Sequence, residues 1–147
     1  MRQFVAIRIL IVDDFQSWRR LVSAMLQDNP EFQIVGEASD GLEAIQKSEE
    51  LQPDLILLDI GLPKLNGLEA ARRMCAVAPG SKILFVSENQ CPTLAREALG
   101  TSRCARGYVV KSDGASELLP AMEAVMQGKQ FVSSRFGTLT LTDPSDV

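Results

Sequence analysis

The chain of 147 residues has the length of one ordinary domain and is too short to build two hydrophobic cores of usual size. Its hydrophobic content of 46% and charged content of 23% exclude an intrinsically disordered chain. The net charge of −4 argues against non-specific binding of this segment to DNA. No apolar run reaches the about 18 residues of a transmembrane helix, and the N-terminus lacks a signal-peptide pattern, so a cytoplasmic location without membrane contact is expected.

The absence of histidine excludes Ser–His catalysis, a histidine-containing zinc site and any phosphohistidine role for the chain. The three cysteines, Cys75, Cys91 and Cys104, form no C-x-x-C pair. An odd number of cysteines in a cytoplasmic chain predicts that they are reduced and act as small packing residues.

The chain begins with an apolar run over Ile7–Val12 that predicts a buried strand. A helix is expected next, because apolar residues recur at i, i+3, i+4, i+7 and i+8: Trp18, Leu21, Val22, Met25 and Leu26. Asn29-Pro30 ends this helix, since the residue before proline avoids the helical region. The run Phe32–Ala38 predicts a second strand and is the most polar of the strand-like runs.

Asp40 is predicted to cap a second helix, which carries Leu42 and Ile45 and stops before Pro53. The third strand is expected at Leu55–Leu58. A third helix, which ends at Pro79-Gly80, carries the apolar residues Leu68, Ala71 and Cys75. The fourth strand is expected at Ile83–Val86.

The pattern for a fourth helix, around Pro92 to Leu99, is weak, and the fifth strand is expected at Tyr108–Val110. A fifth helix ends at Gly128 and has an apolar face made of Leu118, Met122, Val125 and Met126. Pro120 is tolerated only near a first turn, so this helix is predicted to start late or to be kinked.

Alternation of strands and helices predicts an α/β fold with a parallel sheet. The polar second strand suits a sheet edge, and the apolar first, third and fourth strands suit positions covered on both faces. Right-handed crossovers then favour a doubly wound, five-stranded parallel sheet in the order 2-1-3-4-5, with helices on both faces. Residues 1–128 are expected to form this domain. Residues 129–147 are expected to be a linker or C-terminal tail, in which 130–132 and 139–142 are possible short extended pieces.

Polar residues follow directly on the predicted strands: Asp13 and Asp14, then Asp59, Ser87 and Lys111. Taken singly, each of these residues is also explained by a structural role, such as a helix cap, a turn residue or a solvated strand end. In the predicted sheet, however, all of them lie at the carboxyl edge around the crevice where the winding reverses. Their convergence predicts one functional site.

Three carboxylates held about 4 Å apart repel one another by roughly 4 kcal/mol per pair at an effective dielectric of 20. A hard cation such as Mg²⁺ makes such a cluster tolerable and also neutralises phosphoryl oxygens. Since Lys111 adds a second positive group and a carboxylate is a competent nucleophile, the set predicts phosphoryl transfer to an aspartate.

At these residues the chain resembles the receiver domains of two-component response regulators, over about residues 6–128. The matching segments are Arg8–Asp14, Asp54–Pro63, Asn66-Gly67, Val86-Ser87 and Gly107–Lys111. The motif Asp-Ile-Gly-Leu-Pro-x-Leu-Asn-Gly, from Asp59 to Gly67, and the Gly128-Lys-x-Phe131 ending are similar to the subfamily whose receivers precede a helix-turn-helix (LuxR-type) DNA-binding domain. The resemblance implies a flavodoxin-like domain.

The resemblance implies that Asp59 is the phosphoacceptor. It also implies that Asp14, Asp59 and the backbone carbonyl of Gly61 ligate Mg²⁺, while Asp13 acts largely through water. Ser87 would bind a phosphoryl oxygen, and Lys111 would pair with the phosphoryl group or with Asp59.

Tyr108 matches the aromatic switch position, with an edge-strand aromatic that covers the sheet as the alternative. Two departures affect the activation surface: Glu88 adds negative charge near the pocket, and Cys91-Pro92 starts helix 4 atypically. Gly61 and Asn89 sit at positions that resemble those where the family tunes phosphate hydrolysis. Because Gly61 offers no side chain to orient water, no phosphate lifetime is predicted.

Three functions are compatible with these residues. The first is a regulatory module that a sensor histidine kinase phosphorylates, that forms a homodimer on activation, and that reaches DNA only through an output domain missing from the sequence. The second is a stand-alone phosphotransfer intermediate. The third, a phosphatase with an aspartyl-phosphate intermediate, needs a cap domain for which the chain has no residues to spare. The module is therefore predicted to act only on its own phosphoryl group and not as an enzyme.

Overall fold

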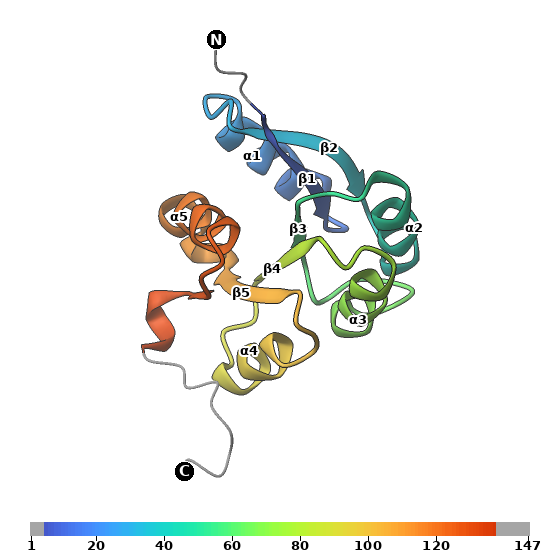
Figure 1. The fold of residues 1–147 in the computed structure, drawn as a ribbon. Helices are drawn as coiled ribbons and strands as arrows, with labels where there is room; N and C mark the ends of the chain where they lie inside the picture. Colours follow the sequence, from blue (N-terminus) through green and yellow to red (C-terminus); the bar gives the residue numbers. More distant parts are fainter. Residues whose placement is uncertain (1–4, 138–147) are drawn as a thin grey trace.

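A central sheet with helices on both faces makes up the part of the chain that the computed structural model describes, residues 5–137 (Figure 1). Every neighbouring pair of strands is parallel, and the order is β2-β1-β3-β4-β5-β6. The strands span β1 Ile7–Val12, β2 Phe32–Ala38, β3 Leu55–Leu58, β4 Lys82–Ser87, β5 Ala105–Val110 and β6 Phe131–Val132. The predicted order 2-1-3-4-5 is confirmed, and β6 adds a strand beside β5.

Helices join the successive strands, as parallel pairing requires. They span α1 Gln16–Leu26, α2 Gly41–Leu51, α3 Gly67–Val77, α4 Pro92–Leu99 and α5 Gly114–Met126. In Figure 1, α1 and α5 cover one face of the sheet, and α2, α3 and α4 cover the other. The doubly wound arrangement is therefore confirmed. Among residues 5–137, no helix is both long and apolar enough to cross a bilayer.

The core consists of two apolar layers, one on each face of the sheet. Side chains along β1 alternate between the layers, with Leu10 in the layer under α2 and α3 and with Ile9 in the layer under α1 and α5. Strands β3 and β4 have almost no exposed residue, as the apolar runs predict. This two-sided burial holds the carboxyl ends of β1, β3 and β4 rigidly beside one another.

The local signals for helix ends are mostly confirmed. Asp40 caps α2, and its carboxylate accepts a hydrogen bond from the backbone N–H of Glu43. Gly128, at φ +86°, follows α5 as its stop. The prediction of a late start for α5 is wrong, because the helix begins at Gly114 and Pro120 lies inside it, past the first turn.

Two apolar side chains that the helical spacing assigns to buried faces lie mainly in solvent. Leu21 on α1 and Leu42 on α2 are each 51% exposed. Both residues therefore sit at the margin of their helix's apolar stripe, where the spacing rule alone does not separate buried from exposed positions.

The segment after α5 packs on the domain. Phe131–Val132 pairs with β5, the Ser133 hydroxyl accepts a hydrogen bond from the Val110 N–H at 2.9 Å, and Phe136 packs edge-on against Tyr108. The possible extended piece at 139–142 lies outside the described residues.

The cysteines differ from the prediction. Cys75 at the end of α3 and Cys104 just before β5 form a disulfide, with their Cα atoms 5.9 Å apart, whereas Cys91 is free and exposed. The prediction that all three are reduced is wrong in this structure. The physical reason is that folding brings two positions 29 residues apart within bonding distance, which no local spacing reveals.

Candidate functional site

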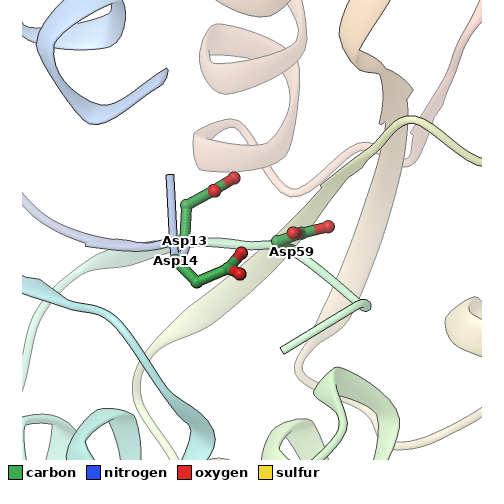
Figure 2. A group of neighbouring side chains, drawn as sticks. All are labelled: Asp13, Asp14 and Asp59. Atoms are coloured by element: carbon green, nitrogen blue, oxygen red, sulfur yellow. The ribbon is translucent and has the colours of Figure 1, made fainter. Parts of the chain in front are cut away.

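The predicted site residues converge at the carboxyl edge of the sheet. Asp13 and Asp14 follow β1 and Asp59 follows β3, and Figure 2 shows these three side chains gathered at the neighbouring ends of the two strands. Carboxylate oxygens of all three lie within 4.8 Å of one another. Backbone hydrogen bonds fix this edge, since the N–H of Asp59 donates to Val12 and the N–H of Asp13 donates to Ala38.

Ser87 and Lys111 complete the rim. Ser87 ends β4, is 5% exposed, and its hydroxyl oxygen accepts a hydrogen bond from the Asn89 N–H at 3.1 Å. Lys111 follows β5, and its side chain is 8% exposed. Asp59, Gly61, Ser87 and Lys111 line one pocket of about 230 Å³. The structure therefore brings together every residue that the strand ends placed there.

A glycine shapes the loop that carries Asp59. The N–H of Gly67, at the start of α3, donates to the carbonyl of Ile60 at 2.7 Å. A Cβ at position 67 would lie 2.4 Å from the carbonyl oxygen of Asp59. Only glycine allows α3 to approach the loop this closely, so the resemblance motif Asn66-Gly67 has a packing reason.

The charges in the site are unbalanced. The Lys111 ammonium lies 2.7 Å from Asp13 Oδ2 and 3.7 Å from Asp59 Oδ2, and within residues 5–137 it is the one cation that forms ion pairs with this group of three carboxylates. Burial raises the pKa of Asp59 above its ordinary value, the ion pair with Lys111 opposes this rise, and Asp13 adds to it. The pocket thus holds a buried carboxylate that is short of positive charge.

The donor set fits a hard divalent cation. Asp13 Oδ2 is buried, and its one partner among the described residues is the Lys111 ammonium, 2.7 Å away. Asp14 is exposed, so the cluster opens to solvent and retains room for water ligands. Carboxylate oxygens are ligands of Mg²⁺ or Ca²⁺, whereas zinc sites usually include sulfur or imidazole. Asp13, Asp14 and Asp59 are therefore suitable ligands for Mg²⁺.

Tyr108 is fully buried below the pocket. Its ring lies between Phe85 and Phe136, with centroids 6.4 and 5.8 Å away, and its hydroxyl donates to the backbone carbonyl of Asn89 at 2.9 Å. Burial raises the pKa of Tyr108, so the hydroxyl stays protonated and acts as a donor at neutral pH. The side chain thus covers the sheet and also contacts the loop after β4.

The family of the chain follows from comparison with known proteins. The model of the response regulator receiver domain matches residues 9–123. The chain belongs to this family. Receiver domains are signalling modules of two-component systems that interact with histidine kinases.

Similar proteins include both multidomain regulators and single receivers. The receiver is 36% identical over 126 residues to the transcriptional regulatory protein DegU of Brevibacillus brevis, covering 86% of this chain and 52% of DegU. It is 33% identical to the chemotaxis protein CheY of Listeria monocytogenes, covering 80% of this chain and 96% of CheY. The chain thus spans about half the length of DegU and nearly all of CheY.

Solved structures give the same result. A LuxR-family response regulator from Aurantimonas sp. SI85-9A1 superposes with a TM-score of 0.80 at 31% identity, over 86% of this chain and 89% of that one. The response regulator domain of Thermotoga maritima CheB superposes with a TM-score of 0.76, also at 31% identity, over 84% of this chain and 98% of that one. The open parallel sheet of this receiver is therefore of the flavodoxin-like type.

Some residues at the receiver's site were not singled out from the sequence. The rings of Phe15 and Trp18 lie over the ammonium of Lys111, and the Arg135 guanidinium pairs with Asp113 in the loop after β5. The sequence pattern indicated Trp18 only as part of an apolar helix face. No pattern indicated Arg135, because its partner lies 22 residues away.

Proposed function

We propose that this receiver accepts a phosphoryl group on Asp59 from the phosphohistidine of a sensor histidine kinase, with Mg²⁺ as cofactor. The observation that supports this proposal most strongly is the position of Asp59. Its carboxylate is 7% exposed, lies within 4.8 Å of two further carboxylates, and faces Lys111 in a pocket large enough for a phosphoryl group. A buried carboxylate in these surroundings suits a nucleophile better than a structural ion pair.

The reaction requires positioning and positive charge. An Asp59 oxygen attacks phosphorus, the phosphorus–nitrogen bond of the donor breaks, and its electron pair leaves with the imidazole nitrogen. The bound cation would neutralise phosphoryl oxygens and the charge of its carboxylate ligands. Asp14, Asp59 and the Gly61 carbonyl would hold the cation, and Asp13 would act largely through water. Lys111 supplies the second positive group at the phosphoryl oxygens.

The switch would begin at Ser87. A phosphoryl group adds about −1.5 to −2 charges and three acceptor oxygens. One hydrogen bond to such a group contributes about 1.5 to 3 kcal/mol, whereas inverting a 1:99 equilibrium takes about 5.5 kcal/mol. Ser87, Lys111 and the cation must therefore act together on the loops after β3 and β4. Tyr108 links the second of these loops to β5 through its bond to Asn89.

The proposed output is control of transcription. DegU is a transcriptional regulatory protein, and this chain covers 52% of its length. We infer that the receiver forms a homodimer on activation and reaches DNA through an output domain outside this sequence, in the cytoplasm. The alternative is a stand-alone phosphotransfer module, which the 96% coverage of a CheY favours.

The direct test is the intact mass of the protein after incubation with acetyl phosphate and Mg²⁺. The wild type should gain one phosphoryl group, and Asp59→Asn should gain none. Asp28→Asn, which alters an exposed carboxylate after α1, is the control and should behave as the wild type. Phosphorylation of Asp59→Asn to the wild-type extent, or none in the wild type, would overturn the proposal.

A further inference from the structure

Two aromatic rings from the start of α1 enclose the ammonium group of Lys111. Its Nζ lies 5.4 Å from the ring centroid of Phe15 and 5.2 Å from that of Trp18. Both distances are within the range of cation–π attraction, which is strongest for tryptophan. Phe15 is 55% exposed, so packing in a hydrophobic core does not explain its place over the pocket.

The start of α5 also packs closely on the indole of Trp18. Gly114 begins α5, and a Cβ at that position would lie only 3.0 Å from Cη2 of Trp18. The indole therefore lies close to both the Lys111 ammonium and the first turn of α5. This packing restricts where the ring can move and makes it a firm support for the lysine.

The rings can hold the Lys111 ammonium when the carboxylates that pair with it bind a cation. Lys111 pairs with Asp13 at 2.7 Å and with Asp59 at 3.7 Å, and both carboxylates belong to the group suited to holding a cation. When they ligate a cation, their attraction for the ammonium weakens. An aromatic face attracts an ammonium group but does not compete for a hard metal ion. The two rings can thus keep Lys111 at the rim after its ion pairs weaken.

We propose that Phe15 and Trp18 are positioning residues, which hold the Lys111 ammonium where it meets the incoming phosphoryl group. This inference rests on the proposed phosphorylation of Asp59. A contact with a ring is weaker than an ion pair, so the ammonium is free to turn toward phosphoryl oxygens when they arrive.

The rate of phosphorylation by acetyl phosphate tests this role without a kinase. Trp18→Ala should react about tenfold more slowly than the wild type at equal Mg²⁺, as expected for a desolvated cation–π contact. Trp18→Phe, which keeps an aromatic face, should restore most of the rate. Leu21→Ala removes an exposed apolar side chain from the same helix and should leave the rate unchanged. Phe15→Leu keeps apolar bulk at an exposed position but removes the aromatic ring, so it should also slow the reaction. This variant tests the role even if Trp18→Ala does not fold.

An unchanged rate in Trp18→Ala and Phe15→Leu would overturn the inference. An equal loss in Trp18→Phe and Trp18→Ala would also overturn it, since the loss would then reflect the shape of the indole rather than an aromatic face.

The emission of Trp18 gives a second readout that needs no phosphoryl donor, because it is the only tryptophan of the chain. Lys111→Met should change the emission of the resting protein, and Lys129→Met, after α5, should not. No change in Lys111→Met would refute the contact. If the emission changes in Lys111→Met but the wild type is never phosphorylated, the proposed function is wrong and the contact between Lys111 and Trp18 is still supported. If the wild type is phosphorylated and the ring variants react at the wild-type rate, only the positioning role is refuted.

Discussion

Asp59→Asn should stabilise the metal-free domain, because the surroundings of Asp59 oppose its charge. Burial raises the pKa of this carboxyl above 3.8, against the opposing effect of Lys111. An acid with a raised pKa binds more protons in the folded than in the unfolded state, between the ordinary and the raised value. The free energy of unfolding therefore falls as pH rises through that interval. Above the raised pKa of Asp59 the wild type carries this penalty, and the amide removes it.

The size of the stabilisation expected for Asp59→Asn follows from the distances between the charged groups. At 3.7 Å and an effective dielectric of about 20, Lys111 attracts Asp59 by about 4.5 kcal/mol. Asp13, whose carboxylate oxygen lies within 4.8 Å of that of Asp59, repels it by about 3.5 kcal/mol or more. These two contributions nearly cancel. The unfavourable free energy of burying the Asp59 charge therefore remains, together with a screened repulsion from Asp14. We expect Asp59→Asn to raise the free energy of unfolding by about 1 kcal/mol and Tm by about 4 °C.

Thermal unfolding with EDTA measures this difference. The variant should unfold at higher temperature at pH 7, and the gain should shrink as the pH falls through the raised pKa of Asp59 toward its ordinary value. With Mg²⁺ at ten times its Kd, the wild type should gain about 1.4 kcal/mol and the variant much less. Asp28→Asn serves as the control. A less stable Asp59→Asn in EDTA at pH 7, or a gain that persists undiminished at pH 4, would refute the reasoning.

Three further changes test the packing around the site. Gly67→Ala places a Cβ 2.4 Å from a backbone carbonyl oxygen and should lower stability by about 1 to 3 kcal/mol in urea unfolding, whereas Gly80→Ala meets nothing within 4 Å and should be neutral. Asp40→Ala removes the cap of α2 and should lower stability by about 1 kcal/mol; an unchanged urea midpoint would contradict the importance of the cap. Reductant should lower Tm, because a cross-link 29 residues apart is worth about 3 to 4 kcal/mol, and Cys75→Ala should unfold at the same temperature with or without reductant.

The strands and the site were predictable because their signals are local. Short apolar runs predict β1, β2 and β3 with their observed ends, and the polar residue after each run is a feature of the sequence alone. Parallel strands share one carboxyl edge, so Asp13, Asp59 and Lys111 had to converge once the strand order was inferred. From the repulsion among three carboxylates, the sequence also predicted a hard cation at this edge.

The missed features depend on partners distant in the chain. β6 is a strand of two residues, too short for a period-two pattern, so the sequence predicted only a possible extended piece at 130–132, and its pairing depends on the free edge of β5. The disulfide joins two cysteines whose spacing indicates nothing. Trp18 occupies an ordinary position on an apolar helix face, and its contact with Lys111 appears only when α1 and β5 are placed side by side.

Taken alone, the amino-acid order determined the alternation of strands and helices, the sheet order and the set of polar residues at one edge, because each depends on periodicity and on strand direction. The tertiary structure decided how the charges are shared at that edge: Lys111 lies closer to Asp13 than to Asp59, and two rings enclose its ammonium. Such distances follow from how α1 and α5 pack on the sheet, and packing is a property of the whole fold rather than of any segment.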